Sequence, residues 1–263
     1  MDCLGKTPHN YNYLKLEIIM TGSFSILLFL ILSLIAEILG TIGGFGSSVF
    51  FVPIGTYFLD IHSVLGITAI FHLASNISKI TLFRKGINRK LIFQFGIPAI
   101  FFVTIGAFLT RFIESNYLTI ILDSFLIVLS LLLLLIKDYK VSSTWISNLF
   151  GGTLSGLFAG MLGTGGAIRG LFLSSFNLSK EVFIASSAFI DLGVDLSGTI
   201  VYYYNGYIHK DDYFLIPFLI FVGFIGSYIG KLILVNISEE RFRKIVLGLV
   251  FIIGLISLIK IIT

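Results

Sequence analysis

The sequence predicts an all-α polytopic membrane protein, and three observations support this. First, 56% of the 263 residues are hydrophobic and only 12% are charged, whereas soluble domains are roughly 45–50% apolar. Second, apolar runs such as 24–39, 118–136 and 247–259 approach the ~20 residues that an α-helix needs to cross a bilayer core. Third, these runs lack the alternating polar face of a membrane β-barrel. We therefore expect a multi-pass protein of the cell membrane.

Charged and Gly/Pro clusters divide the chain into ten apolar segments. These are 22–41, 46–59, 62–83, 91–112, 117–136, 144–162, 167–177, 182–203, 213–235 and 243–262. The second and seventh are too short to span a bilayer upright, and each follows a glycine cluster. Short hydrophobic segments at corresponding places in two halves indicate a transporter binding site.

An internal repeat relates the two halves at an offset of 120 positions. Five glycines recur at this offset where about one match is expected by chance: Gly40, Gly43, Gly46, Gly86 and Gly106 match Gly160, Gly163, Gly166, Gly206 and Gly226. The sequence thus predicts a polar tail (1–21), a first repeat of about five helices (22–136), a connecting loop (137–143) and a second repeat (144–263). The second helix of each repeat is expected to be short or broken. In the second repeat this helix is the seventh of the ten segments.

Loop charges predict that the two repeats are inverted. The loop near Gly86 holds four basic residues, whereas its mate at 210–212 holds one lysine and two aspartates. The positive-inside rule places the first loop in the cytoplasm and the second outside. Inversion follows if each half crosses five times; if the short segments are re-entrant, each half crosses four times and the repeat is parallel. Four tyrosines near the second loop are expected to form an outer interfacial belt: Tyr202, Tyr203, Tyr204 and Tyr207.

Two glycine-rich stretches carry a family resemblance. "GTIGGFGSSVFFVPI" (40–54) and its weaker echo "GMLGTGGAIRGLFL" (160–173) resemble the signature of the sulfite exporter TauE/SafE family of membrane permeases. The resemblance implies transport of small anions such as sulfite, sulfonates or related carboxylates. The second stretch lacks a proline matching Pro53 and carries Arg169, which leaves the particular substrate open.

The glycine breaks also predict an anion site. A helix that restarts after a break presents free N–H groups and the positive end of its dipole, and starts near 47 and 167 would face one cavity. The alternative is that the glycines serve tight helix packing alone. The candidate substrate-binding residues are Gly43, Gly46, Ser47, Ser48, Asn76, Gly163, Gly165, Gly166 and Arg169.

Two intramembrane carboxylates predict proton coupling. Asp191 and Asp195 lie four residues apart, hence on one helix face, in the middle of an apolar run. Such a pair suits a proton carrier, and His72 on the mate helix is a candidate shuttle. The alternatives are a hydrogen-bonded structural pair or an ion pair with Arg169 for the carboxylates, and a packing role for His72.

Four other charged residues lie within the predicted spans. A buried Arg169 needs an anionic partner, which is either one of the two aspartates or the transported anion; the alternative is an arginine that lines a water-filled entrance. Lys79 lies near a helix end and is expected to reach the membrane surface. Glu37 and Asp123 have no role assigned from the sequence.

The remaining observations exclude several functions. The four histidines lack metal-ligand spacing, and no nucleophile elbow or phosphate-binding loop occurs, so we expect neither an enzyme nor a bound cofactor or metal. Transport without an ATP site is secondary, with a proton or sodium gradient as the candidate driving force. The basic residues lie in short loops, so nucleic acid is not an expected partner. The expected partners are a small anionic solute and the lipid bilayer, and the sequence leaves open whether the protein forms a homodimer. The alternative function is that of a non-transporting membrane subunit.

Overall fold

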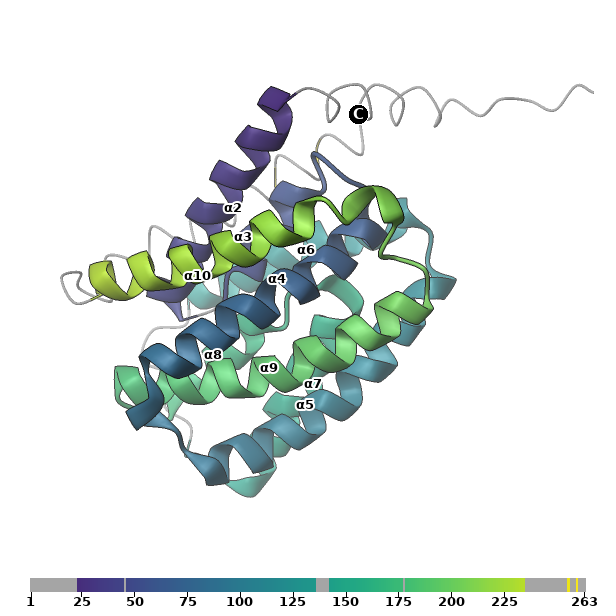
Figure 1. Cartoon of the computed structure of the whole chain (residues 1–263). Coiled ribbons are helices and arrows are strands. Elements are labelled where there is room, and N and C mark those ends of the chain that lie inside the picture. The colour runs from purple at the N-terminus through teal and green to yellow at the C-terminus, as the bar shows by residue number, and fades with distance from the viewer. Residues whose placement is uncertain are drawn as a thin grey trace, which may run out of the picture.

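The computed structural model describes residues 23–44, 46–135, 142–176 and 178–234, with positions 255 and 259. Every regular element among them is helical (Figure 1), which confirms the all-α fold class. The elements are α2 (Ser23–Gly43), α3 (Ser48–Gly55), α4 (Ile61–Leu82), η1 (Arg84–Gly86), α5 (Arg89–Leu109), η2 (Thr110–Phe112), α6 (Ser115–Leu135), α7 (Trp145–Leu162), α8 (Gly166–Ser175), α9 (Lys180–Tyr204), η3 (Lys210–Asp212) and α10 (Leu215–Leu234). The predicted tail, most of the connecting loop and nearly all of the tenth segment lie outside the described residues.

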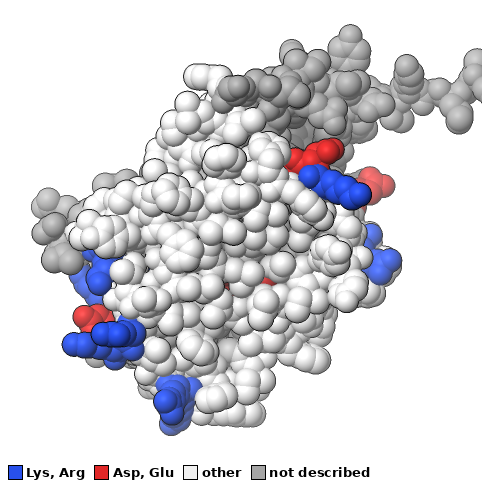
Figure 2. All heavy atoms as spheres, in the orientation of Figure 1, with Lys and Arg blue, Asp and Glu red and all other residues white. Residues whose placement is uncertain are grey.

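Within the described residues, five helices are long and apolar enough to cross a membrane: Phe24–Gly43, Ile61–Leu82, Arg89–Phe112, Lys180–Tyr204 and Leu215–Leu234. Their outward faces are apolar. On α5, for example, Phe93, Ile97 and Phe101 recur every four residues and are each more than 60% exposed. Figure 2 shows the charged side chains gathered near two opposite ends, with an almost uncharged surface between them. This is the surface of a protein whose solvent is lipid.

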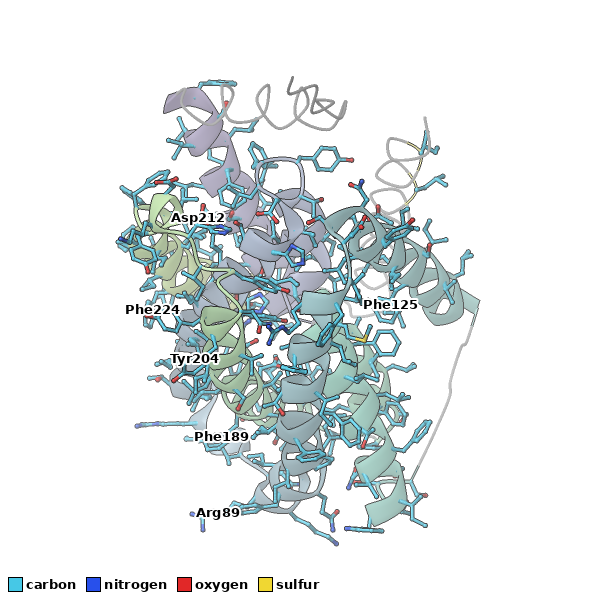
Figure 3. All side chains as sticks on the ribbon, turned by 90° about the vertical axis from the view of Figure 1, so that its right-hand side faces the viewer. Arg89, Phe125, Phe189, Tyr204, Asp212 and Phe224 are labelled. Carbon is cyan, nitrogen blue, oxygen red and sulfur yellow. The ribbon has the colours of Figure 1, made fainter. Side chains whose placement is uncertain are left out.

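The two ends of the molecule differ in charge. The Arg89 end carries Arg84, Lys85, Arg89, Lys90, Lys180, Glu181 and Lys231. The Asp212 end carries Asp60, Arg111, Glu114, Lys210, Asp211 and Asp212. Figure 3 shows Arg89 at one end of the bundle and Asp212 toward the opposite end. Among the residues that the structure describes, one end is therefore strongly basic and the other is acidic overall.

The core of the bundle is the antiparallel pair α4 and α9. Gly66 near the start of α4 faces Tyr207 and Ile208 beyond the end of α9, whereas Gly86 after α4 faces Glu181 at the start of α9. A Cβ on Gly86 would lie 2.2 Å from the Glu181 carbonyl oxygen, so only glycine permits this approach.

Two further helix pairs flank this core. Helix α5 packs on α7 and also on α9, and α10 packs on α2 and also on α4. Glycines bring α5 and α7 into backbone contact: a Cβ on Gly156 would lie 2.2 Å from the Ala99 carbonyl oxygen, and one on Gly160 would lie 2.2 Å from the Val103 carbonyl oxygen. Many glycines thus serve helix packing, the alternative that the sequence left open.

Short polar side chains begin several helices. Asn88, Thr144 and Ser179 accept hydrogen bonds from backbone N–H groups in the first turns of α5, α7 and α9. Asp60 does so for α4, with bonds from the N–H groups of His62 (2.9 Å) and Ser63 (3.3 Å). Burial acts to raise the pKa of Asp60, but its hydrogen bonds from these two residues outweigh burial and lower the pKa to about 2.

The predicted tyrosine belt is half wrong. Tyr203 and Tyr204 are 61% and 82% exposed, as expected for interfacial residues. Tyr202 and Tyr207 are instead buried. The hydroxyl of Tyr202 donates a 2.7 Å hydrogen bond to the Gly160 carbonyl, and that of Tyr207 accepts one from Thr110. Their hydroxyl groups are satisfied inside the bundle rather than by lipid headgroups.

Candidate functional site

Two glycine breaks meet in the middle of the bundle. Gly44 and Gly46, with φ of 69° and 82°, turn the chain between α2 and α3, and Gly163 with φ of 68° does the same between α7 and α8. A Cβ on Gly46 would lie 3.9 Å from the Cα of Gly166, the first residue of α8. The starts of α3 and α8 are therefore neighbours, as the sequence predicted.

A cavity that is partly open to the surroundings lies beside these two helix starts. Its wall comes from the glycine breaks and from α4 and α9. All the predicted site residues line it except Gly43 and Arg169: the lining includes Gly46, Ser47, Ser48, His72, Asn76, Gly163, Gly165, Gly166, Asp191 and Asp195. The structure thus brings together two segments, 46–79 and 163–195, that are distant in the sequence.

Arg169 pairs with Asp191. Both terminal guanidinium nitrogens donate to the two carboxylate oxygens of Asp191, and Nε donates to Ser187 Oγ at 2.7 Å. The arginine is only 1% exposed, and each of its three nitrogens donates one of these hydrogen bonds inside the protein. Of the two kinds of partner that the sequence left open for Arg169, an aspartate is the one present here.

Asp195 has different partners from Asp191. Its Oδ2 accepts a 2.7 Å hydrogen bond from Asn76 Nδ2, and its Oδ1 lies 3.9 Å from His72 Nδ1. The two aspartates therefore divide their roles: one neutralises an arginine, and the other faces an amide and an imidazole.

Glu37 is the centre of a second ion pair that the sequence analysis missed. This fully buried carboxylate lies 2.8 Å from Lys79 Nζ and accepts hydrogen bonds from Thr41, Ser47 and Ser227. The expectation that Lys79 reaches the membrane surface is wrong, because its side chain is 8% exposed and lines the cavity. The signal that could have predicted the pair is the cost of an unpaired charge inside a membrane, which applies to both residues.

A chain of polar contacts joins the Glu37 pair to Asp195. Ser47 Oγ donates to Glu37 and lies 2.9 Å from His72 Nε2. A hydroxyl has one proton, so with its proton directed to Glu37, Ser47 accepts from the Nε2–H of His72. The other ring nitrogen, Nδ1, then faces Asp195. The site therefore holds two ion pairs, a third carboxylate and an imidazole between them.

The family profile described as Sulfite exporter TauE/SafE matches residues 29–256, nearly the whole chain. The chain belongs to this family. It is accordingly a membrane permease, in agreement with its apolar helices and lipid-facing surface. No curated protein and no solved structure matches the chain.

Proposed function

We propose that this TauE/SafE chain is a secondary transporter of small anions, such as sulfite, a sulfonate or a related organic anion, and that it couples transport to protons. The observation that carries the proposal is the cavity, where two helix starts and a set of buried ionisable side chains meet inside a membrane permease.

The helix starts supply the attraction for an anion. The first N–H groups of a helix have no partner within it, and the helix dipole adds partial positive charge there. Helix α3 begins at Ser48 and α8 at Gly166, and both residues line the cavity. The hydroxyl group of Ser48, which also lines the cavity, adds a donor without adding charge. An oxyanion between the two starts would receive hydrogen bonds from both halves of the protein.

Charge balance favours a proton as the coupling ion. The two cations Lys79 and Arg169 are already matched by Glu37 and Asp191, so Asp195 is an additional carboxylate beside the cavity. An incoming anion would add one more negative charge in a region of low dielectric, which is costly. A proton on Asp195 or on His72 offsets that charge. Sodium is the alternative coupling ion.

We further propose that the two halves are inverted repeats, so that the cavity opens alternately to the two ends. Taking α2 to α5 as the mates of α7 to α10, each principal contact has a counterpart: α5 on α7 corresponds to α10 on α2, and α5 on α9 to α10 on α4. Gly106 faces Leu157, and its mate Gly226 faces Glu37, the residue 120 positions before Leu157. The mates α4 and α9 run antiparallel, as inversion requires. The basic Arg89 end is then cytoplasmic.

The experiment is anion uptake into liposomes that contain only this protein. With sulfite or methanesulfonate outside, we expect uptake that an inward pH gradient accelerates. Asp195→Asn should abolish the acceleration and keep part of the anion exchange, because the amide retains the bond geometry but takes no proton. The control is Asp211→Asn, which removes an exposed carboxylate of η3.

Each outcome has a clear meaning. Absence of any anion movement in the wild type would refute transport and favour the non-transporting subunit. Normal proton-driven uptake in Asp195→Asn would refute this residue as the proton carrier. Acceleration by a sodium gradient instead of a pH gradient would identify sodium as the coupling ion.

A further inference from the structure

We infer that Lys79, rather than Arg169, is the cation that binds the transported anion, and that Glu37 holds this lysine in position when no anion is bound. The inference rests on the proposed anion transport and names the residue that recognises the substrate's charge. Four features of the site support it.

The first feature is that three of the five N–H groups of Arg169, one on each nitrogen, hold the side chain to α9. Its two terminal nitrogens are taken by Asp191 and its Nε by Ser187, and its side chain is absent from the cavity wall. To exchange Asp191 for an anion, it would have to break a buried bidentate pair, and removing one partner of such a pair is strongly destabilising because it leaves a buried charge unpaired. Arg169 therefore serves to neutralise Asp191 and to hold α8 on α9.

The second feature is the unused capacity of Lys79. An ammonium group carries three donors in rotatable positions. Two are directed to Glu37 Oε1 at 2.8 Å and to Ser75 Oγ at 3.2 Å. Because Lys79 also lines the cavity, its remaining donor is available to a solute there.

The third feature is that Glu37 does not depend on the lysine for its hydrogen bonds. Its Oε1 accepts from Thr41 at 3.0 Å and from Ser227 at 2.9 Å, and its Oε2 accepts from Ser47. If the ammonium moves toward an anion, the buried carboxylate keeps three hydroxyl donors. The lysine can therefore be shared between Glu37 and a substrate at a lower cost than Arg169 could be withdrawn from its pair.

The fourth feature is position. One carboxylate, that of Glu37, binds the ammonium of Lys79 through one oxygen and the hydroxyl of Ser47 through the other. Since Ser47 directly precedes α3, the carboxylate of Glu37 links the ammonium to the residue at that helix start. Asn76, one turn before Lys79 on α4, lines the same wall. An oxyanion at the start of α3 would therefore be within reach of Lys79.

The test measures anion affinity by exchange in proteoliposomes, with sulfite, methanesulfonate or acetate as the probe, whichever the wild type exchanges fastest. The main variant is the double substitution Glu37→Gln/Lys79→Met, which removes both charges and leaves no unpaired buried ion. We expect its half-saturation concentration to rise at least tenfold. Lys85→Met, which removes an exposed lysine after α4, should leave the value unchanged.

Lys79→Arg provides a second test that does not depend on the double variant. It keeps a positive charge beside Glu37, so the protein should fold and the affinity should fall far less than in the double variant. Wild-type affinity in the folded double variant, or equal affinity in Lys79→Arg and the double variant, would overturn the inference while leaving anion transport intact. A wild type that exchanges none of the three anions would overturn the proposed function itself, and the inference with it.

Discussion

Replacement of Gly156 by alanine should destabilise the fold through the contact between α5 and α7. The added Cβ would lie 2.2 Å from the Ala99 carbonyl oxygen and 2.7 Å from the Ala99 Cα. Close carbon–oxygen contacts normally lie near 3.3–3.6 Å, so the two helices would have to separate by about 1 Å. The obstacle is backbone on both sides, which no rotamer change can relieve.

The magnitude follows from a matched control. Gly96→Ala places a Cβ 3.5 Å from Ile190 Cγ1, an ordinary van der Waals contact, on the face of α5 that meets α9. Both substitutions gain the same helix propensity of about 1 kcal/mol, so this gain cancels when the variants are compared. The remaining difference is the cost of overpacking, about 1–3 kcal/mol. Gly156→Ala should therefore be less stable than Gly96→Ala by this amount.

The assay is reversible unfolding in mixed micelles of mild detergent and SDS. Far-UV circular dichroism follows the helices, and the fluorescence of Trp145, the sole tryptophan and the first residue of α7, follows the environment of that helix. The expected result is a midpoint at lower SDS fraction for Gly156→Ala than for Gly96→Ala. Equal midpoints would refute the argument that backbone contact requires glycine at this position.

Three further predictions follow from the ends and the ion pairs of the protein. Cysteines are placed singly at Asn88 and at Lys210, in a background without the native cysteine, and intact cells are treated with an impermeant thiol reagent. The reagent should label the cysteine at 210 and not the one at 88; labelling of both or of neither contradicts inverted repeats. Arg169→Lys keeps the charge but cannot donate to both oxygens of Asp191, so SDS unfolding should show a loss of stability. Burial raises the pKa of Asp212 above 3.8 although His209 lies 3.5 Å from its carboxylate. The folded state therefore holds the Asp212 proton more tightly than the unfolded state does, so the stability of the fold should fall as pH rises above 3.8. Asp212→Asn should remove this pH dependence, and an unchanged pH profile in the variant would contradict the argument.

The arrangement of the site shows where sequence reasoning reached its limit. The glycine breaks, Ser47 and the aspartates of α9 could be predicted, because a break or a charge inside an apolar run is visible in one dimension. The partner of Glu37 could not. Lys79 is 42 positions away on another helix, and the cost of an isolated charge says that a partner exists but not which residue it is. The assignment of Arg169 to Asp191 rather than Asp195 was equally open, since both lie on one face of α9.

The sequence by itself determined the membrane class, the helices and the places where they break. The expected segment 182–203 became α9 at Lys180–Tyr204, and 62–83 became α4 at Ile61–Leu82. These limits are local: a bilayer of given thickness requires about 20 apolar residues, and capping side chains and glycines mark the ends. Only the tertiary structure decided which helices are neighbours and hence which buried charges meet. In a lipid solvent every helix is apolar outside, so hydrophobicity cannot choose among helix pairs. That choice rests on close backbone packing at glycines and on ion pairs between helices, which form only in three dimensions.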